Sequence, residues 1–429
     1  MNNNSIKILF FFILLLSVTT SFAENSSRRK ISGIIVSGNE RTKEVVIKRE
    51  LLFGIGDAPS DSLLEFSKNR LLALGLFSRV EFYYLPAANG VDLLILVHEQ
   101  LQFFPYPIFD VADRDWNKIT FGAGIAHVNV MGLNHKLNAT LAFGYNAGYS
   151  FNYKIPWLGL KEHLYLNLVA KKFRARNRAV NFDEHHLKFS TSLGKFWTRY
   201  FYTIIVPFYD RINVDAVNAH YMSSATDVDN LGGISLGVGY DTRDLAYYPS
   251  RGLRTMAVVV RNGLFVDYLD YWKYQLDLRR YYTFSGITVA GRISTTQSIG
   301  ELPIYDRVYL GYGERVRGHF YEVYEGRHNV IGQLEFRFTL MHIKYYALPA
   351  PAFIPSYLMR NLKFGLNGAF FVETGEVWTK PEELKFKRLI SGFGVSLIAR
   401  VPYAEILRLD FAFDKKFNTQ LIFEIGMAF

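Results

Sequence analysis

From residue 101 to the C-terminus, apolar and polar residues alternate with a period of two, and this alternation constrains the fold more than any other feature. In the segment 136–145, Leu141 and Phe143 fall on one face of an extended chain. Asn138 and Thr140 fall on the opposite face. Such alternation is typical of β-strands with one apolar face. It predicts sixteen strands, at 101–111, 118–129, 136–145, 149–157, 163–173, 185–197, 201–213, 231–243, 251–262, 270–283, 287–298, 327–340, 362–374, 389–400, 405–413 and 419–429.

The number of strands favours a membrane barrel over a soluble β-sandwich. A sandwich shows the same alternation, but it uses far fewer strands. An even strand number is typical of single-chain bacterial outer-membrane barrels, and a sheet in lipid must close because unpaired backbone groups find no water there. With 36 Phe and 28 Tyr, aromatic residues make up 16% of the chain. The sequence therefore predicts a mainly β fold, a sixteen-stranded antiparallel transmembrane β-barrel over residues 101–429.

The N-terminal 23 residues are typical of a secretory signal peptide. Lys7 precedes eleven uncharged residues, Ile8 to Val18, and small residues stand before the expected cleavage site after Ala23. A membrane-spanning helix would need roughly 20 apolar residues, so a signal peptide is the better interpretation. An exported barrel protein is expected in the bacterial outer membrane.

Residues 30–99 differ in pattern and predict a small α+β domain with the order β-α-α-β-β. An alternating strand at 31–37 precedes two helices, the first capped by Thr42 and the second spanning Ser60 to Leu74. Two further strands follow, joined by a turn near Gly90. About 70 residues can just bury a core.

The composition argues against several functional classes. The chain has no Cys, so neither a disulfide framework nor a thiolate metal site is expected. The net charge of +10 is dispersed, whereas nucleic-acid binding needs cations that cluster on one face. His98 is isolated, and His185 and His186 point to opposite faces of a strand, so neither arrangement predicts a metal site. We expect no enzyme activity, no catalytic residues, no cofactor and no nucleic-acid partner.

Several motifs resemble one known family. Residues 31–99, with ISGIIVSGNERT, LLALGLFSRVEF and VDLLILVHE, resemble a single POTRA domain. YDTRDLAYYPSRG, LPIYDRVYLGYGERVRGHF and FFVETGEVW, in this order, resemble the barrel of the BamA/TamA-type outer-membrane assembly superfamily, also called bacterial surface antigens. The resemblance covers nearly the whole chain after the signal peptide.

The resemblance implies a plugged barrel. In the family, the loop with the Val-Arg-Gly motif (Val316, Arg317 and Gly318) folds back into the lumen, where its arginine meets acids on the wall. The matching acids are Glu335 and Glu373, which the alternation independently places on the inward face. This lumen lock departs from the family pattern twice: His319 stands where an aromatic residue is usual, and Glu373 stands where aspartate is usual.

Other residues point to a weak seam between the first and last strands. Pro105 and Pro107 cannot donate ladder hydrogen bonds, and proline belongs on edge strands. Gly426 matches the position of a kink in the family's last strand. The apolar face with Phe423 and Phe429 resembles the C-terminal signal by which such barrels are recognised for insertion, and Phe429 is expected to face lipid.

These features predict an assembly factor that inserts other outer-membrane proteins. The POTRA domain and the C-terminus would lie in the periplasm, and unfolded outer-membrane proteins would be the clients, with periplasmic chaperones and accessory lipoproteins as further partners. Two alternatives stay open: a translocation pore like those of two-partner secretion, and a passive porin or structural surface antigen. The basic run from Lys171 to Arg178 fits lipopolysaccharide phosphates or a solvated hairpin equally well.

Overall fold

The small N-terminal domain has the predicted order of elements. The structure is a computed structural model that describes residues 30–88, 90–111, 116–159, 163–177, 180–311, 314–320, 322–349, 359–402 and 405–429. The expected signal peptide lies outside these residues. The domain consists of β1 (Ile31–Ser37), α2 (Glu44–Lys48), α3 (Asp61–Ala73), β2 (Phe77–Ala87) and β3 (Gly90–Glu99). β3 lies in the centre of the sheet, parallel to β1 and antiparallel to β2.

Local sequence explains the helices, with one correction. The side chain of Ser60 accepts a hydrogen bond from the Leu63 amide and so caps α3, as Ser at this position is expected to do. The first helix begins after Lys43 without a side-chain cap, so the prediction that Thr42 caps it is wrong. Apolar side chains of both helices and all three strands form the core: Ile31, Val46, Ile47, Leu71, Leu76, Phe77, Val80, Leu93, Ile95 and Val97 are nearly inaccessible.

Sixteen strands form the second unit, one for each strand predicted. They are β4 (Phe103–Val111), β5 (Ile119–Val130), β6 (His135–Gly144), β7 (Gly148–Leu158), β8 (Leu164–Asn177), β9 (Phe182–Phe196), β10 (Phe201–Asn213), β11 (Val228–Asp241), β12 (Gly252–Leu264), β13 (Tyr271–Phe284), β14 (Ile287–Gly300), β17 (His328–Tyr346), β18 (Leu362–Trp378), β19 (Ile390–Val401), β20 (Glu405–Asp414) and β21 (Thr419–Ile425). Each is antiparallel to its neighbours. The part of the chain that the structure describes contains no helix long and apolar enough to cross a bilayer.

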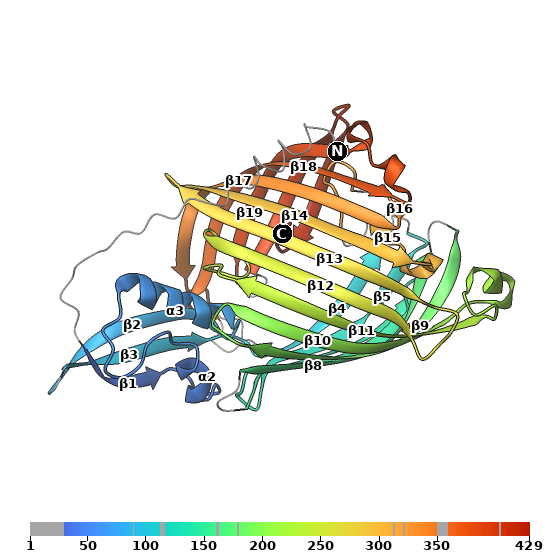
Figure 1. Cartoon of the computed structure of the whole chain (residues 1–429). Coiled ribbons are helices and arrows are strands. Elements are labelled where there is room, and N and C mark those ends of the chain that lie inside the picture. The colour runs from blue at the N-terminus through green and yellow to red at the C-terminus, as the bar shows by residue number, and fades with distance from the viewer. Residues whose placement is uncertain are drawn as a thin grey trace.

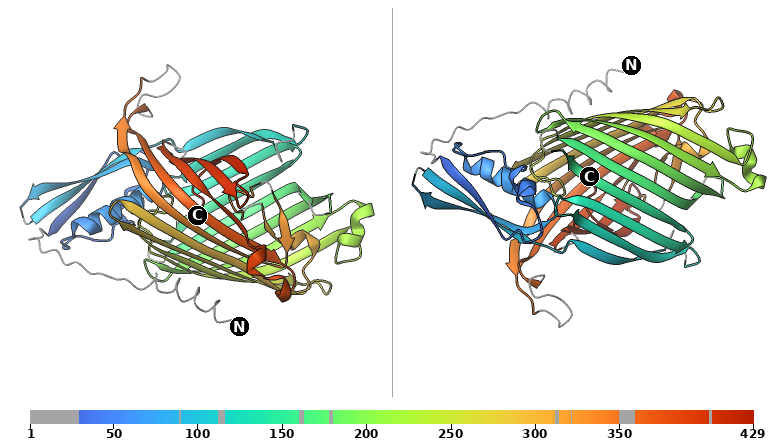
Figure 2. Two further views of the ribbon diagram at one scale, coloured as in Figure 1. Left: turned by 90° about the horizontal axis from the view of Figure 1, so that it is seen from above. Right: turned by 90° about the horizontal axis from the view of Figure 1, so that it is seen from below.

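The strands run obliquely, side by side, around an interior, with the N-terminal domain at one end (Figures 1 and 2). The sheet order begins at β4 and ends at β21. Among the described residues no ladder joins these two strands, so a seam remains where the sequence predicted closure. Among the described strands of this sheet, β4 and β21 each have one unpaired edge, and every other strand is paired on both sides.

The alternation predicted from sequence sorts the side chains by face. On β17, Phe336 is 41% exposed, whereas its neighbours Glu335 and Arg337 are 0% and 1% exposed. On β18, Phe370 is exposed and Glu373 is buried. Apolar residues therefore cover the outside of the sheet, and polar residues face the interior, the reverse of a soluble protein.

The N-terminal domain contacts the turn between β5 and β6. The Asn129 amide Nδ2 donates to the Thr42 hydroxyl at 2.9 Å, and the Lys43 amide donates to the Gly132 carbonyl at 3.0 Å. Gly132 has φ +71°, and a Cβ there would lie 2.4 Å from the Arg41 carbonyl oxygen. The close approach of the two backbones explains why Thr42 is buried at the junction and does not cap α2.

Arg49 and a stack of three rings extend this junction. The Arg49 guanidinium lies 5.1 Å from the Trp157 ring. His163 stacks between Trp157 and Phe196, with ring centroids 3.5 and 4.2 Å away. Burial lowers the pKa of His163 to about 4, and the cationic Arg70 and Arg49 lower it as well.

We expect the stability of this junction to depend on pH through His163. Because its pKa is lower in the folded protein than in the unfolded chain, the unfolded chain binds more protons between about pH 6.5 and 4. The stabilisation from the neutral ring is complete above that window and is lost as pH falls through it. Protease sensitivity of the N-terminal domain, measured from pH 8 to 4, should rise in the wild type. In His163→Phe this increase in protease sensitivity at low pH should be smaller. In the control His220→Phe, which replaces an exposed histidine, the increase should be as large as in the wild type. Identical pH dependence in the wild type and in His163→Phe would show that His163 is not responsible.

Candidate functional site

The long segment between β14 and β17 places the Val-Arg-Gly motif inside the barrel. A small hairpin of β15 (Val308–Leu310) and β16 (Tyr324–Gly326) frames the loop. Val316 is 1% exposed and packs against Leu310 and Ile331, which anchors the loop to the wall. Gly318 has φ +98°, a left-handed conformation that favours glycine, and a Cβ there would lie 2.6 Å from the Phe413 carbonyl oxygen.

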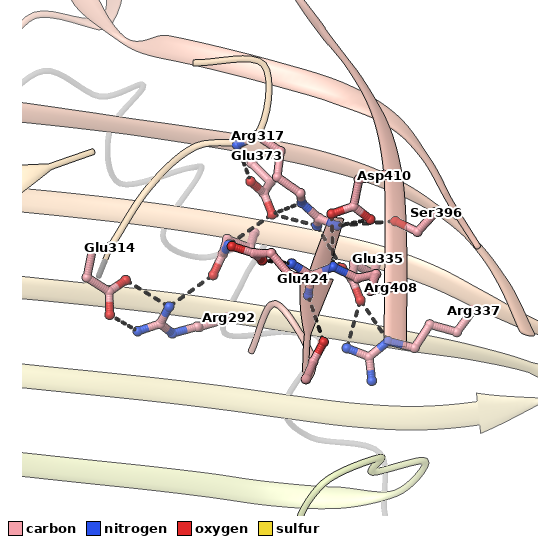
Figure 3. Close-up of polar contacts among 12 residues, drawn as sticks. Arg292, Glu314, Arg317, Glu335, Arg337, Glu373, Ser396, Arg408, Asp410 and Glu424 are labelled. Carbon is pink, nitrogen blue, oxygen red and sulfur yellow. Dashed lines mark hydrogen bonds and ion pairs between the residues drawn. The ribbon is translucent and has the colours of Figure 1, made fainter. Parts of the chain in front are cut away.

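Arg317 lies among acidic groups of the wall (Figure 3). Its Nε donates to Glu373 Oε1 at 2.8 Å, and its backbone amide donates to Glu373 Oε2 at 2.8 Å. Its Nη2 donates to Glu335 Oε1 at 2.7 Å. Its Nη1 lies 3.5 Å from Asp410 Oδ1 and 3.3 Å from Ser396 Oγ. The structure thus brings together the three residues that the sequence singled out, and adds Asp410 and Ser396.

The wall is shaped to receive the arginine. The guanidinium carbon lies 3.6 Å from the centre of the Phe371 ring, so the cation rests on an aromatic face. A Cβ on Gly392 would lie 1.6 Å from the Arg317 carbonyl oxygen, so the loop backbone occupies space that only glycine leaves free. The Arg317 side chain is 4% exposed, and its guanidinium makes charge-assisted hydrogen bonds whose loss would leave a buried carboxylate without a cation.

Two further arginines extend the network. Arg337 donates from Nε to Glu335 Oε2 at 2.8 Å, and Arg408 donates from Nε to Asp410 Oδ2 at 2.9 Å. Arg408 also pairs with Glu424 of the last strand. Sequence reasoning missed Asp410, Arg337 and Arg408 as members of the network. The available signal was alternation, since each of them is a charged residue between apolar neighbours on a strand.

The two departures from the family pattern have local explanations. The backbone amide of Phe320 donates to Gln420 Oε1 at 3.0 Å, and its side chain packs against the cluster of Phe371, Ala412 and Ile422, so the aromatic position is filled one residue late. His319 turns to Glu322, with 3.0 Å between Nδ1 and Oε2. Glu373 reaches both the side chain and the backbone of Arg317, as described above.

The two seam prolines lie on the first barrel strand, as predicted, whereas Gly426 lies just beyond the end of the last strand and not within it. Pro105 and Pro107 are on β4, and both are exposed on the outer face. The ladder between β4 and β5 runs past both prolines without a register shift. Gly426 follows the last residue of β21 and has φ +101°. The strand therefore ends at Ile425, four residues earlier than predicted.

Comparison with known sequences identifies the family. The profile of the Omp85 superfamily domain matches residues 129–429, well over half of the chain. The chain belongs to the Omp85 superfamily. A POTRA profile, described as a surface antigen variable number repeat, matches residues 29–100. No individually curated protein sequence matches this Omp85 chain.

Solved structures with a similar fold support the architecture. BamA from Haemophilus ducreyi lacking POTRA domains 1–3 is 17% identical, with a TM-score of 0.51, and the match covers 94% of this chain and 84% of that one. CdiB from Acinetobacter baumannii is 16% identical, with a TM-score of 0.51 and coverage of 92% and 73%. CdiB from Escherichia coli is 10% identical, with a TM-score of 0.51 and coverage of 96% and 92%. The β-barrels of the Omp85 family are outer-membrane proteins, and the resemblance to BamA-type barrels stated from sequence is confirmed.

The prediction that Phe429 of this Omp85 barrel faces lipid is wrong. After the turn at Gly426 the chain leaves the wall and enters the lumen, and Phe429 is only 6% exposed. Its ring lies 6.4 Å from that of Tyr281 and 5.3 Å from the Arg337 guanidinium. Phe423, within β21, is 65% exposed on the outer face. A positive φ at Gly426 breaks the alternation, which otherwise would have put both rings outside.

We expect the two C-terminal phenylalanines to differ in their contributions to stability. Phe429→Ala removes a buried ring from the Omp85 lumen and should lower the free energy of unfolding by about 3–5 kcal/mol. Phe423→Ala, the matched control on the lipid face, should cost clearly less. Urea unfolding in detergent, with the heat-modifiable folded band on semi-native gels as a second readout, measures both. Equal losses in the two variants would contradict the lumen position of Phe429.

The described residues contain no group of three or more His, Asp or Glu side chains arranged to hold a metal ion. The buried charges around Arg317 in this Omp85 lumen pair with one another and with the loop. Their geometry can fix a long loop inside the barrel.

Proposed function

We propose that this Omp85 protein is an outer-membrane assembly factor that inserts client β-barrel proteins at its seam. The observation that carries the proposal is the absence of a ladder between the described strands β4 and β21. Two strand edges with unpaired backbone groups can each accept a further strand. A client hairpin added there would satisfy groups that are costly to leave unpaired in lipid.

Both prolines of β4 contribute to this edge. Proline in a sheet normally has its missing N–H on the free side of an edge strand. The unshifted β4–β5 ladder fits that arrangement, which leaves β4 with fewer donors toward β21. Gly426 ends β21 early and shortens the opposite edge. The seam would therefore close weakly and open for clients.

The POTRA domain supplies further strand edges. In its sheet order β1-β3-β2, the outer strands β1 and β2 each have one free side. At the end of β2, Tyr83, Tyr84 and Leu85 are consecutive and exposed. We propose that a free edge receives unfolded clients by strand addition in the periplasm, where the C-terminus would also lie, and that periplasmic chaperones or accessory lipoproteins deliver them.

A translocation pore of the same superfamily remains the main alternative. The structural likeness does not favour either role, because the BamA and CdiB structures have the same TM-score. We also propose that the protein has no enzymatic activity, because the buried charges around Arg317 are committed to holding the loop.

A passive porin would conduct, and the filled lumen predicts that this protein does not conduct steadily. The loop with Val316 and Arg317 and the tail that ends at Phe429 both occupy the interior. We expect small, irregular currents in planar bilayers. A variant in which a short glycine linker replaces residues 308–326 should conduct more, and stable currents in the wild type would favour a porin.

Depletion of the protein followed by an inventory of outer-membrane proteins tests the proposal. General loss of barrel proteins would support an insertion factor with many clients, and loss of one would support a dedicated factor. An unchanged outer membrane with one secreted protein missing from the medium would overturn the proposal in favour of translocation. Complementation with the wild-type gene is the control.

A further inference from the structure

Basic residues gather on the outer face of β8 and β10, close to the ends of these strands at Asn177 and Asn213. These ends lie remote from the POTRA domain (Figure 1). We name Lys172, Arg174, Arg176 and Arg211 the basic patch. The first three are even-numbered residues of β8, as is Leu168, which is 38% exposed on the outer face, so all four side chains point outward. The interleaved side chains point inward.

Arg211 belongs to the same face on β10. It is two residues from Tyr209, which is 40% exposed, so both side chains point to the same outer face of β10. Lys172 and Arg211 are both partners of Leu187 on the intervening strand β9. Two strand spacings separate them, roughly 10 Å. Lys172 and Arg174, two residues apart on one strand, are separated by roughly 7 Å.

An aromatic band borders the basic patch on its membrane side. Two residues along the strands from Lys172 and Arg211, in the next row that faces outward, Phe151, Phe189 and Tyr209 are 44%, 47% and 40% exposed. Aromatic girdles mark the boundary between the hydrocarbon and the headgroups. The basic patch therefore lies at headgroup depth.

The cations of the basic patch are only partly compensated. The Arg174 guanidinium donates to the Tyr145 and Gly144 carbonyls, and its Nη1 lies 3.9 Å from Asp183 Oδ2, a carboxylate that it shares with Arg176. Arg176 pairs with Asp183 at 2.8 Å. Among the described residues, no carboxylate lies within ion-pair distance of Lys172 or Arg211. Like charges this close repel one another unless an anion lies between them.

We infer that the basic patch binds the headgroup of a membrane glycolipid that carries two phosphates. Arginine offers a planar fork of donors to phosphate, and lysine offers a compact charge. Two cations on either side of Leu187, with the fixed Arg174 beside them, match separate phosphates on one headgroup better than a single one. The aromatic band would contact the acyl chains below. Binding of this kind would hold the wall of β8 to β10 in the membrane, whatever the protein's clients are.

Binding of phosphorylated lipid A to the folded protein tests the inference. Native mass spectrometry in detergent would measure the affinity of lipid A with two phosphates, with dephosphorylated lipid A as the matched probe. Removing both free cations, in Lys172→Ala/Arg211→Ala, should weaken binding of the phosphorylated probe roughly thirtyfold. Arg199→Ala/Arg251→Ala, which removes two exposed arginines at the opposite end of the barrel, should bind as the wild type does.

Three results would overturn the inference: unchanged affinity in Lys172→Ala/Arg211→Ala, equal affinity of the wild type for the dephosphorylated probe, or full displacement of lipid A by an equal concentration of inorganic phosphate. The last would make the patch a general anion site. The heat-modifiable band on gels establishes that each variant is folded. Lys172→Gln/Arg211→Gln, which retains most of the side-chain length, gives the same test if the alanine variant does not fold.

Discussion

Replacing Arg317 with alanine is expected to release the Val-Arg-Gly loop from the wall and to lower the free energy of unfolding by about 3–5 kcal/mol. The reason lies in Glu373, which is 1% exposed. In the variant, Glu335 would still be paired with Arg337, and Asp410 would still be paired with Arg408. Glu373 would lose its cation and would accept a side-chain hydrogen bond only from the neutral amide of Gln333. A buried carboxylate without a cation is strongly destabilising. Limited proteolysis of the loop and urea unfolding measure the two effects.

Two further variants separate the lock from a general effect of losing an arginine. Arg307→Ala removes a half-exposed arginine of the same long segment and should behave like the wild type. Arg317→Ala/Glu373→Gln removes the unpaired charge and should recover much of the lost stability. Two results together would exclude a lock built on Glu373. The first is a double variant that is no more stable than Arg317→Ala. The second is an Arg307→Ala variant that loses as much stability as Arg317→Ala does. Assembly activity should fall with loop release if the loop serves the seam.

Covalent closure of the seam between β4 and β21 is expected to abolish assembly activity without preventing folding. The chain has no Cys, so introduced cysteines give an unambiguous disulfide. Phe103 and Phe423 lie on the two edges, and both face outward, with 48% and 65% exposure. A scan of neighbouring positions would find the pair that approaches within disulfide geometry. The oxidised barrel should keep its folded band and fail to insert clients, and reductant should restore insertion.

A disulfide elsewhere in the wall provides the matched control. Val238 and Ala257 are partners in the ladder between β11 and β12, and both face outward. Their cysteine pair should lock two strands that are already joined, and assembly should continue. If the oxidised seam variant supports insertion as well as this control does, clients do not enter between β4 and β21, and the proposed mechanism fails.

Sequence alternation determined the wall of the barrel. Because successive side chains of a strand point to opposite faces, a run such as 330–340 specifies both the strand and the inward position of Glu335. The same reasoning placed all sixteen barrel strands, and together with helix-capping residues it predicted the order of elements in the POTRA domain. The pairing of Arg317 with both glutamates needed more than alternation, and the family motif supplied it.

Only the tertiary structure decided what fills and joins these parts. Asp410 reaches Arg317 because the loop crosses four strands of the wall, a relation that no sequence spacing encodes. Phe429 turns inward because one backbone angle at Gly426 ends the strand, and alternation cannot register a change of direction. Thr42 is buried by Asn129 of another domain. The period of the side-chain pattern depends only on the backbone geometry within one segment. Contacts between segments depend on how the fold brings residues distant in the sequence close together.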